Sequence, residues 1–117
     1  MKPADLSPEV LELIAERFRV LGEPARLRIL STLMAGECSV TDLVDRTGLQ
    51  QANVSKHLGV LRASGFVRRR KEGLRAFYTL ADPSVFTLCE VMCGRIQAHA
   101  DAHLSLFESG DARVPAP

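Results

Sequence analysis

Residues 49–61, LQQANVSKHLGVL, carry the pattern that decides the fold. Val54, Leu58 and Leu61 recur at the spacing of helical turns and line one apolar face, while most other positions are polar. The stretch therefore predicts a helix over residues 51–64 that buries one face and leaves a polar face free.

A second short helix is predicted immediately before this one, over residues 40–47, with Leu43 and Val44 on its apolar side. The two helices are joined through Gly48-Leu49-Gln50. This separation is typical of a helix–turn–helix, whose second helix meets base edges in the major groove with its N-terminal residues. The residues placed to contact bases or phosphates are Gln50, Gln51, Asn53, Ser55, Lys56 and His57.

A β-hairpin is predicted directly after the second helix. Residues 66–71 and 75–80 flank Glu72-Gly73, where the glycine would supply the turn. The first of these strands is strongly basic. A basic hairpin in this position indicates a wing, the element that accompanies the helix–turn–helix in winged-helix proteins.

The wing supplies further candidate DNA contacts. We expect Arg68, Arg70 or Lys71, and Arg75 to bind phosphates or to enter the minor groove. Side chains alternate between the two faces of a strand, so Arg68, Arg69 and Arg70 cannot all face DNA. Arg69 is expected to face away and to pair with an acidic group.

Charge is distributed unevenly along the chain, although the formal net charge is only +1. Residues 46–75 hold eight Lys and Arg against Glu72 alone, and the other 87 residues carry 7 basic and 13 acidic groups. A basic segment in an otherwise acidic chain is the pattern of a polyanion-binding surface. Arg62, which lies in this segment, is added to the predicted DNA contacts.

Three more helices complete the predicted fold. They span residues 8–21, 24–35 and 83–107, and each begins where a polar residue precedes a proline. The fold class is thus mainly α with a small β-hairpin, namely five helices and a two-stranded wing. We expect one domain over residues 1–117, with an ordered core over about 8–107.

Length and composition exclude several classes of protein. The chain has 117 residues, too few for a typical two-domain enzyme, and no apolar run long enough to span a membrane. Its start lacks a secretory signal, and its three cysteines are an odd number. We therefore expect a cytoplasmic protein without a disulfide framework.

Four segments of the sequence resemble the ArsR/SmtB family of winged-helix repressors. They are LGEPARLRIL at 21–30, the stretch at 49–61, SGFV at 64–67 and EGLRAFYTL at 72–80. The resemblance covers roughly residues 10–107. It implies a homodimer that represses its own operon by binding an inverted-repeat operator in double-stranded DNA until an effector releases it.

A dimer is also expected from the residues themselves, because two copies double the electrostatic attraction to DNA and match a two-fold operator. The last helix is apolar over a wide arc, which indicates that it packs on its own core and on a partner. We expect the first helix, which carries Glu9, Glu12 and Glu16, to join that interface. The stripe of the last helix consists of Phe86, Cys89, Cys93, Ile96, Ala100, Leu104 and Phe107.

Two metal sites known from the family are missing here. Where the resemblance implies two thiolates at the opening of the helix over residues 40–47, this chain has Ser39 and Thr41. Where it implies a zinc site on the last helix, Asp82-Pro83-Ser84 lacks the histidine, and Arg95 and Ala98 replace the later ligands.

Cys89 and Cys93, with Cys38 as a candidate third member, are predicted to form the effector site. Residues four apart lie on one face of a helix, so both thiols of the last helix are presented together. They could bind trivalent arsenic with a third thiolate, or zinc with His99, or form a polysulfide bridge. His99 and His103 have a spacing that also suits zinc, but solvent-facing or interface histidines are the more common outcome.

Other interpretations remain open. Both helix cysteines lie on the apolar stripe, and free cysteine often packs as a small hydrophobic residue, which would leave a constitutive DNA-binding regulator with no effector. A winged helix that binds RNA or protein is less favoured by the polar groups at 50–56. A cysteine-based redox enzyme is disfavoured because Cys89 and Cys93 do not form a C-x-x-C motif.

Overall fold

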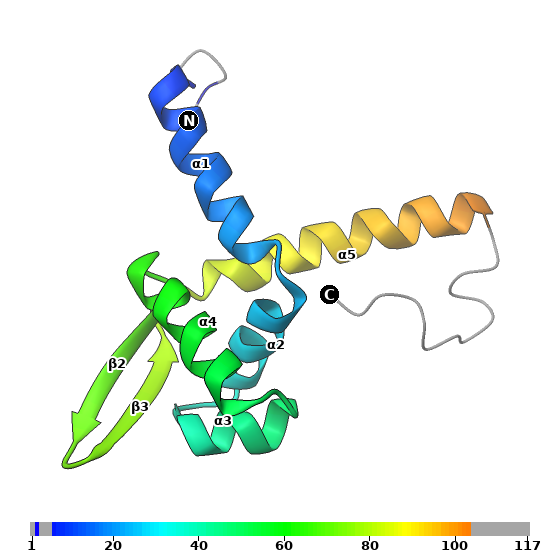
Figure 1. Ribbon diagram of the computed structural model, residues 1–117. Helices are drawn as coiled ribbons and strands as arrows, with labels where there is room; N and C mark the ends of the chain where they lie inside the picture. Colours follow the sequence, from blue (N-terminus) through cyan, green and yellow to red (C-terminus); the bar gives the residue numbers. More distant parts are fainter. Residues whose placement is uncertain (1, 3–5, 104–117) are drawn as a thin grey trace. The chain divides into compact units, whose positions relative to one another are not determined.

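The computed structural model describes Lys2 and residues 6–103, and the chain divides into two compact units, Met1–Ala81 and Asp82–Pro117. The first unit contains four helices and three strands (Figure 1). In chain order they are α1 (Pro8–Leu21), α2 (Pro24–Leu33), β1 (Cys38–Ser39), α3 (Val40–Thr47), α4 (Gln51–Ala63), β2 (Val67–Glu72) and β3 (Arg75–Leu80). The second unit contains α5 (Ser84–His103). Of the predicted last helix, Leu104 and Phe107 lie outside the described residues.

The helices begin close to where the prolines placed them. The Ser7 side chain accepts a hydrogen bond from the Val10 amide at 3.3 Å and so caps α1, which starts with Pro8. α5 begins at Ser84, one residue later than expected, and its amide donates to Oδ1 of Asp82 at 3.1 Å. α2 ends two residues earlier than expected, because the chain turns towards Gly36, whose φ of 140° does not belong to a helix.

The helix–turn–helix is fixed by local hydrogen bonds at both ends of α3. Oγ of Ser39 accepts from the Asp42 amide at 3.1 Å, and the Ser39 amide donates to Oδ2 of Asp42 at 2.9 Å, which forms a capping box. Gly48 then ends α3 in the left-handed region with φ 74°. Only glycine adopts this conformation without strain, so the chain turns here into α4.

The apolar faces of the helices meet in one core within the first unit. The buried residues come from every helix of that unit and from the base of the hairpin. They include Val20, Ile29, Leu30, Leu33, Leu43, Val54, Leu58, Leu61, Phe66, Val67 and Tyr78. The predicted stripe of α4 is therefore the face that anchors this helix.

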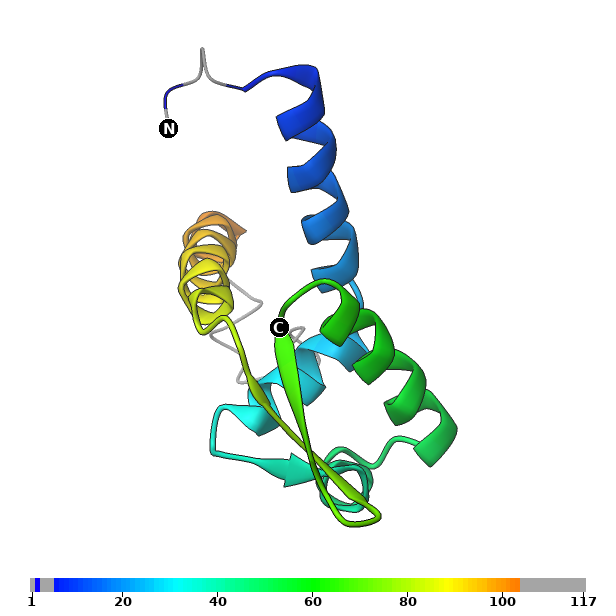
Figure 2. The ribbon, with the colours of Figure 1, turned by 90° about the vertical axis from the view of Figure 1, so that its left-hand side faces the viewer.

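The sheet has three strands rather than the expected two. β1 pairs antiparallel with β3, opposite Phe77 and Tyr78, and the strand order is β1-β3-β2 (Figure 2). The hairpin turn is also displaced by one residue, because Glu72 pairs with Arg75 and leaves Gly73-Leu74 as the loop. Gly73 has a φ of 62°, which suits the tight turns that match the twist of a hairpin.

Candidate nucleic-acid interface

The outer face of α4 presents a row of polar side chains. Val54, Leu58 and Leu61 are buried on one side of α4, so helical geometry turns the opposite side outwards. Gln50, Gln51, Asn53, Ser55 and Lys56 are all exposed. These five predicted residues are therefore available to another molecule.

His57 differs from the other predicted residues of α4, because its ring is half-buried. Nε of Arg26 donates a hydrogen bond to Nδ1 of His57 at 3.2 Å, and Nη1 of Arg26 donates to the carbonyl of Val20 at the same distance. Burial lowers the pKa of His57, and the Arg26 charge lowers it further. Nδ1 of His57 thus joins α4 to Arg26 of α2, and Arg26 in turn joins both to the end of α1.

Arg17 of α1 holds the other end of α4, a role that the sequence did not reveal. Its Nη1 donates to the carbonyl of Ser64 at 2.9 Å, and its guanidinium carbon lies 4.2 Å from the centre of the Phe66 ring. A cation beside a helix C-terminus is stabilised by the partial negative charge there. Two arginines therefore fix the position of α4 relative to α1.

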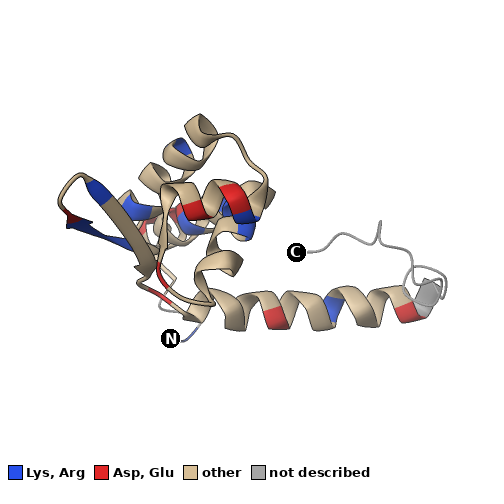
Figure 3. Cartoon of the chain, turned by 90° about the horizontal axis from the view of Figure 1, so that it is seen from below, with Lys and Arg blue, Asp and Glu red and all other residues tan. Residues whose placement is uncertain are grey.

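Basic residues continue along the chain from α4 onto the hairpin, where blue segments of the cartoon in Figure 3 mark Lys and Arg. Arg62, Arg68, Arg69 and Lys71 are exposed. Within residues 6–103, no hydrogen bond or ion pair engages these four side chains. They are free to meet an anion.

Arg70 is the ion-paired arginine of the wing, so the expectation that Arg69 would play this part is wrong. Nη2 of Arg70 lies 2.7 Å from Oε1 of Glu37, and Nη1 of Arg70 lies 2.6 Å from Oε2 of Glu72. These contacts raise the pKa of Arg70 and lower that of Glu37. The guanidinium carbons of Arg70 and Arg75 lie 4.8 and 5.0 Å from the centre of the Phe77 ring.

Comparisons with known proteins agree with this architecture. The protein-family model described as bacterial regulatory protein, arsR family, matches residues 23–69 of this chain. The HTH-type transcriptional regulator Rv0081 of Mycobacterium tuberculosis (strain ATCC 25618 / H37Rv) is 40% identical over 86 residues, covering 73% of this chain and 75% of that protein. The chain belongs to the ArsR family. The resemblance of its sequence to this family is thus confirmed.

Solved structures confirm the winged helix-turn-helix fold of this ArsR-family chain. The crystal structure of Rv0081 has a TM-score of 0.73 at 34% identity and covers 85% of this chain and 100% of that one. The homodimeric winged helix-turn-helix DNA-binding domain Mb0332 of Mycobacterium bovis, solved by NMR, has a TM-score of 0.69 at 29% identity, covering 86% and 94%.

A further relative of this ArsR-family chain carries a name that refers to a metal. It is a probable mercury resistance operon repressor of Streptomyces lividans. The two are 36% identical over 88 residues, which cover 75% of this chain and 69% of that protein.

The three cysteines of this ArsR-family chain lie in different surroundings. Cys38 is buried in β1, where its Sγ donates to the Gly36 carbonyl at 3.6 Å and accepts from Nη1 of Arg46 at 3.5 Å. Burial raises the pKa of the Cys38 thiol. Cys89 is half-buried and Cys93 is exposed, one turn apart on α5.

No group of three His, Cys, Asp or Glu side chains that could hold a metal ion occurs in the part of this single chain that the structure describes. His99 is exposed on α5, and the side chain of His103 lies outside that part.

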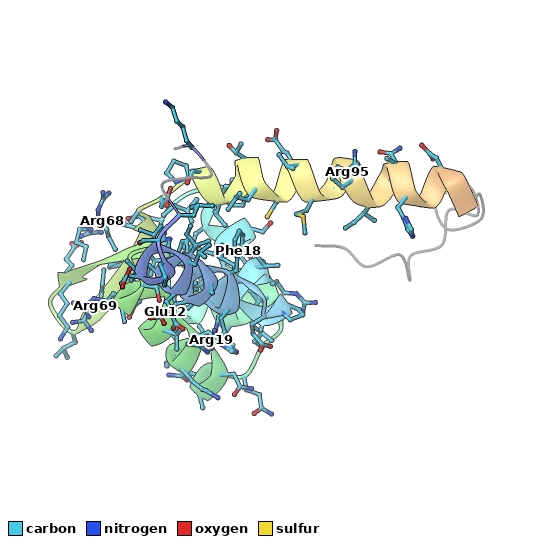
Figure 4. The ribbon with its side chains drawn as sticks, turned by 90° about the horizontal axis from the view of Figure 1, so that it is seen from above. Glu12, Phe18, Arg19, Arg68, Arg69 and Arg95 are labelled. Atoms are coloured by element: carbon cyan, nitrogen blue, oxygen red, sulfur yellow. The ribbon has the colours of Figure 1, made fainter. Side chains whose placement is uncertain are left out.

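Large apolar side chains are exposed on α1 and on α5. Those of α1 are Leu11, Leu13 and Phe18, and those of α5 are Leu88, Val91, Met92 and Ile96. In Figure 4, Phe18 lies on a different side of α1 from the charged Glu12 and Arg19. Among the described helices, none combines the length and the apolar character needed to cross a membrane.

Proposed function

We propose that this ArsR-family regulator is a homodimeric repressor that binds an inverted-repeat operator in double-stranded DNA. The observation that carries the proposal is the exposed row of Gln51, Asn53 and Lys56 on α4, which a basic hairpin follows in the chain. Asn and Gln can form two hydrogen bonds with adenine, and Lys binds guanine or phosphate. The side chains on α4 thus match the hydrogen-bonding groups of base edges in the major groove. We place this activity in the cytoplasm.

Dimerisation through α1 and α5 is part of this proposal. Both helices expose large apolar side chains in the single chain, which a partner would cover. The related Mb0332 domain is described as homodimeric. Two copies would place their recognition helices in successive major grooves, about 34 Å apart.

The test is binding to a duplex from upstream of the protein's own gene, measured by mobility shift. Replacing Gln51, Asn53 and Lys56 together by alanine should abolish discrimination between this duplex and one of scrambled sequence. Ser31→Ala, which removes an exposed hydroxyl from α2, is the control and should bind as the wild type does. Unchanged discrimination by the triple variant would refute the assignment of α4.

We also propose that Cys89 and Cys93 receive the effector, with Cys38 as one candidate for a third ligand. A thiophilic ligand such as trivalent arsenic, zinc or a polysulfide fits two thiols one turn apart on a helix. The relative from Streptomyces lividans is named for resistance to mercury, another thiophilic metal, which supports this class of ligand. Since one chain gathers only two of these thiols on α5, a third ligand would come from Cys38, His99 or the partner chain.

Titration of the protein–operator complex with arsenite, zinc, persulfide and peroxide, side by side, tests the effector proposal. One agent should release DNA at stoichiometric concentration from the wild type and not from a Cys89→Ser/Cys93→Ser variant. Equal release from both proteins would show that these thiols do not receive the effector.

Constitutive binding is the second candidate function. It is favoured by the buried position of Cys38, which is that of a small core residue. If none of the four agents releases the operator, this candidate replaces the effector proposal and the DNA-binding proposal stands.

A further inference from the structure

The pairing of β2 with β3 decides which wing residues share a face. Directly opposite residues of an antiparallel pair lie on the same face of a sheet. Arg69 is paired with Tyr78, which is buried, and Arg70 is paired with Phe77. Lys71, two residues after Arg69, returns to the face of Arg69.

Figure 4 shows Arg68 and Arg69 projecting to opposite sides of the hairpin, with Arg69 on the side of α4. This side is the one that packs on the helices at the base of the hairpin, since Val67 is buried there. Arg69 and Lys71 therefore extend the surface that begins with the polar face of α4, whereas Arg70 lies on the other face.

The other face of the hairpin is already occupied by carboxylates. Nε and Nη2 of Arg70 donate to the two oxygens of Glu37 at 3.1 and 2.7 Å, and Nη1 donates to Glu72 at 2.6 Å. All three guanidinium nitrogens are thus engaged. The three side chains together carry one net negative charge, which opposes the approach of a phosphate.

Glu37 lies in the segment between α2 and β1, two residues before Ser39, the N-cap of α3. Its bidentate contact with Arg70 therefore joins the wing to the start of the helix–turn–helix. Bidentate pairs fix geometry as well as supplying energy, because both groups are planar.

We propose that Arg69 and Lys71 are the wing's phosphate contacts, and that Arg70 is a positioning residue that holds the wing against the helix–turn–helix through Glu37. This inference rests on the proposed DNA binding. It differs from the expectation drawn from the sequence, in which Arg70 binds DNA and Arg69 does not.

The salt dependence of DNA binding tests the inference, on a fluorescently labelled duplex of arbitrary sequence that is long enough for two half-sites. The plot of log K against log salt has a negative slope, and each lost phosphate contact makes it less steep by about 0.9. A change in both chains of a dimer therefore makes it less steep by about 1.8. Arg69→Gln and Lys71→Gln should each produce this decrease. Arg70→Gln and Glu37→Gln should leave the slope unchanged.

The lysine variants separate a charge from a geometric role. Arg69→Lys should keep the wild-type slope, because a phosphate contact needs the charge alone. Arg70→Lys should weaken binding as much as Arg70→Gln does, since one ammonium cannot reproduce the bidentate contact with Glu37. The Glu37→Gln/Arg70→Gln double variant should bind no worse than either single variant, because all three lose one shared interaction.

The inference is overturned if Arg70→Gln reduces the steepness of the salt dependence as a lost phosphate contact would, or if Glu37→Gln increases it, as a phosphate contact newly made by the released Arg70 would. It is also overturned if neither Arg69→Gln nor Lys71→Gln alters the slope. In each of these results the duplex is still bound, so the proposed function survives. Failure of the wild type to bind any duplex would instead refute the proposed function. Thermal unfolding of each variant shows whether it is folded.

Discussion

Arg26 donates a hydrogen bond from Nε to Nδ1 of His57, across 3.2 Å between α2 and the recognition helix α4. Nδ1 must be unprotonated to accept this bond, so the structure requires neutral His57 with its proton on Nε2. Protonation would remove the acceptor and place a second positive charge beside Arg26. The helix that carries the proposed base contacts is thus held by a hydrogen bond that protonation of His57 would break.

The stability of the fold should therefore decrease as the pH falls below the ordinary histidine value of about 6.5. The pKa of His57 is lowered in the folded state, so the unfolded chain binds more protons in this range. The free energy of unfolding therefore decreases as the pH decreases, until the pH is below the folded pKa as well. Urea unfolding on either side of this range measures the effect. His57→Asn, which keeps an acceptor oxygen near the place of Nδ1 and does not titrate, should lose this part of the pH dependence.

Two of the chain's three histidines, His99 and His103, are the same in the wild type and in this variant. The difference between the two pH profiles therefore isolates His57. Parallel profiles would show that folding does not lower the pKa of His57.

Local sequence patterns predicted the elements that depend on neighbouring residues. α1 and α3 begin and end where caps, prolines and glycines placed them, and α4 ends one residue early. β1 was not predicted, because a strand of two residues has no alternation and is defined only by its distant partner β3.

The faces of the wing could not be assigned from the sequence for a related reason. Alternate residues of a strand share a face, and Phe66 and Val67 are both apolar and both buried. The sequence therefore does not tell whether the odd-numbered or the even-numbered residues of the strand face the core. The parity set by Val67 places Arg69 on the side of α4, and the other parity would have placed Arg70 there. The partner of Arg70, Glu37, lies 33 residues away in the chain and gives no local signal.

Removing the cap of α3 should destabilise the protein. Ser39→Ala deletes the hydroxyl that accepts from the Asp42 amide at 3.1 Å, and the loss of a serine N-cap costs about 1 kcal/mol. The free energy of unfolding from urea titration measures this loss. Ser31→Ala, on the exposed side of α2, should change it by less than about 0.5 kcal/mol. A cost at Ser31 equal to that at Ser39 would show that the cap is not the cause.

Two glycines of the helix–turn–helix should respond in opposite ways to alanine. Gly48 has a φ of 74°, which alanine adopts only with strain, so Gly48→Ala should destabilise the protein by about 1 kcal/mol or more. Gly59 lies inside α4, and apart from its chain neighbours and the adjacent backbone of its own helix nothing lies within 4 Å of the position that a Cβ would take. Gly59→Ala should therefore stabilise the protein by about 1 kcal/mol, as measured by thermal unfolding. Changes of the same sign at both positions would contradict this account.

The Cys38 thiol should be far less reactive in the folded protein than in the unfolded chain. Cys38 is fully buried in β1, opposite Tyr78, and its pKa is raised chiefly by burial, so few molecules carry the reactive thiolate. Iodoacetamide labelling followed by mass spectrometry, with and without urea, measures the protection at each cysteine. Cys38 should be protected in the folded protein, and all three cysteines should react at similar rates in urea. If Cys38 reacts equally fast in both conditions, β1 opens readily from β3, and Cys38 is then accessible to the effector proposed for Cys89 and Cys93. Protection at Cys38 instead restricts thiol chemistry in the folded protein to α5.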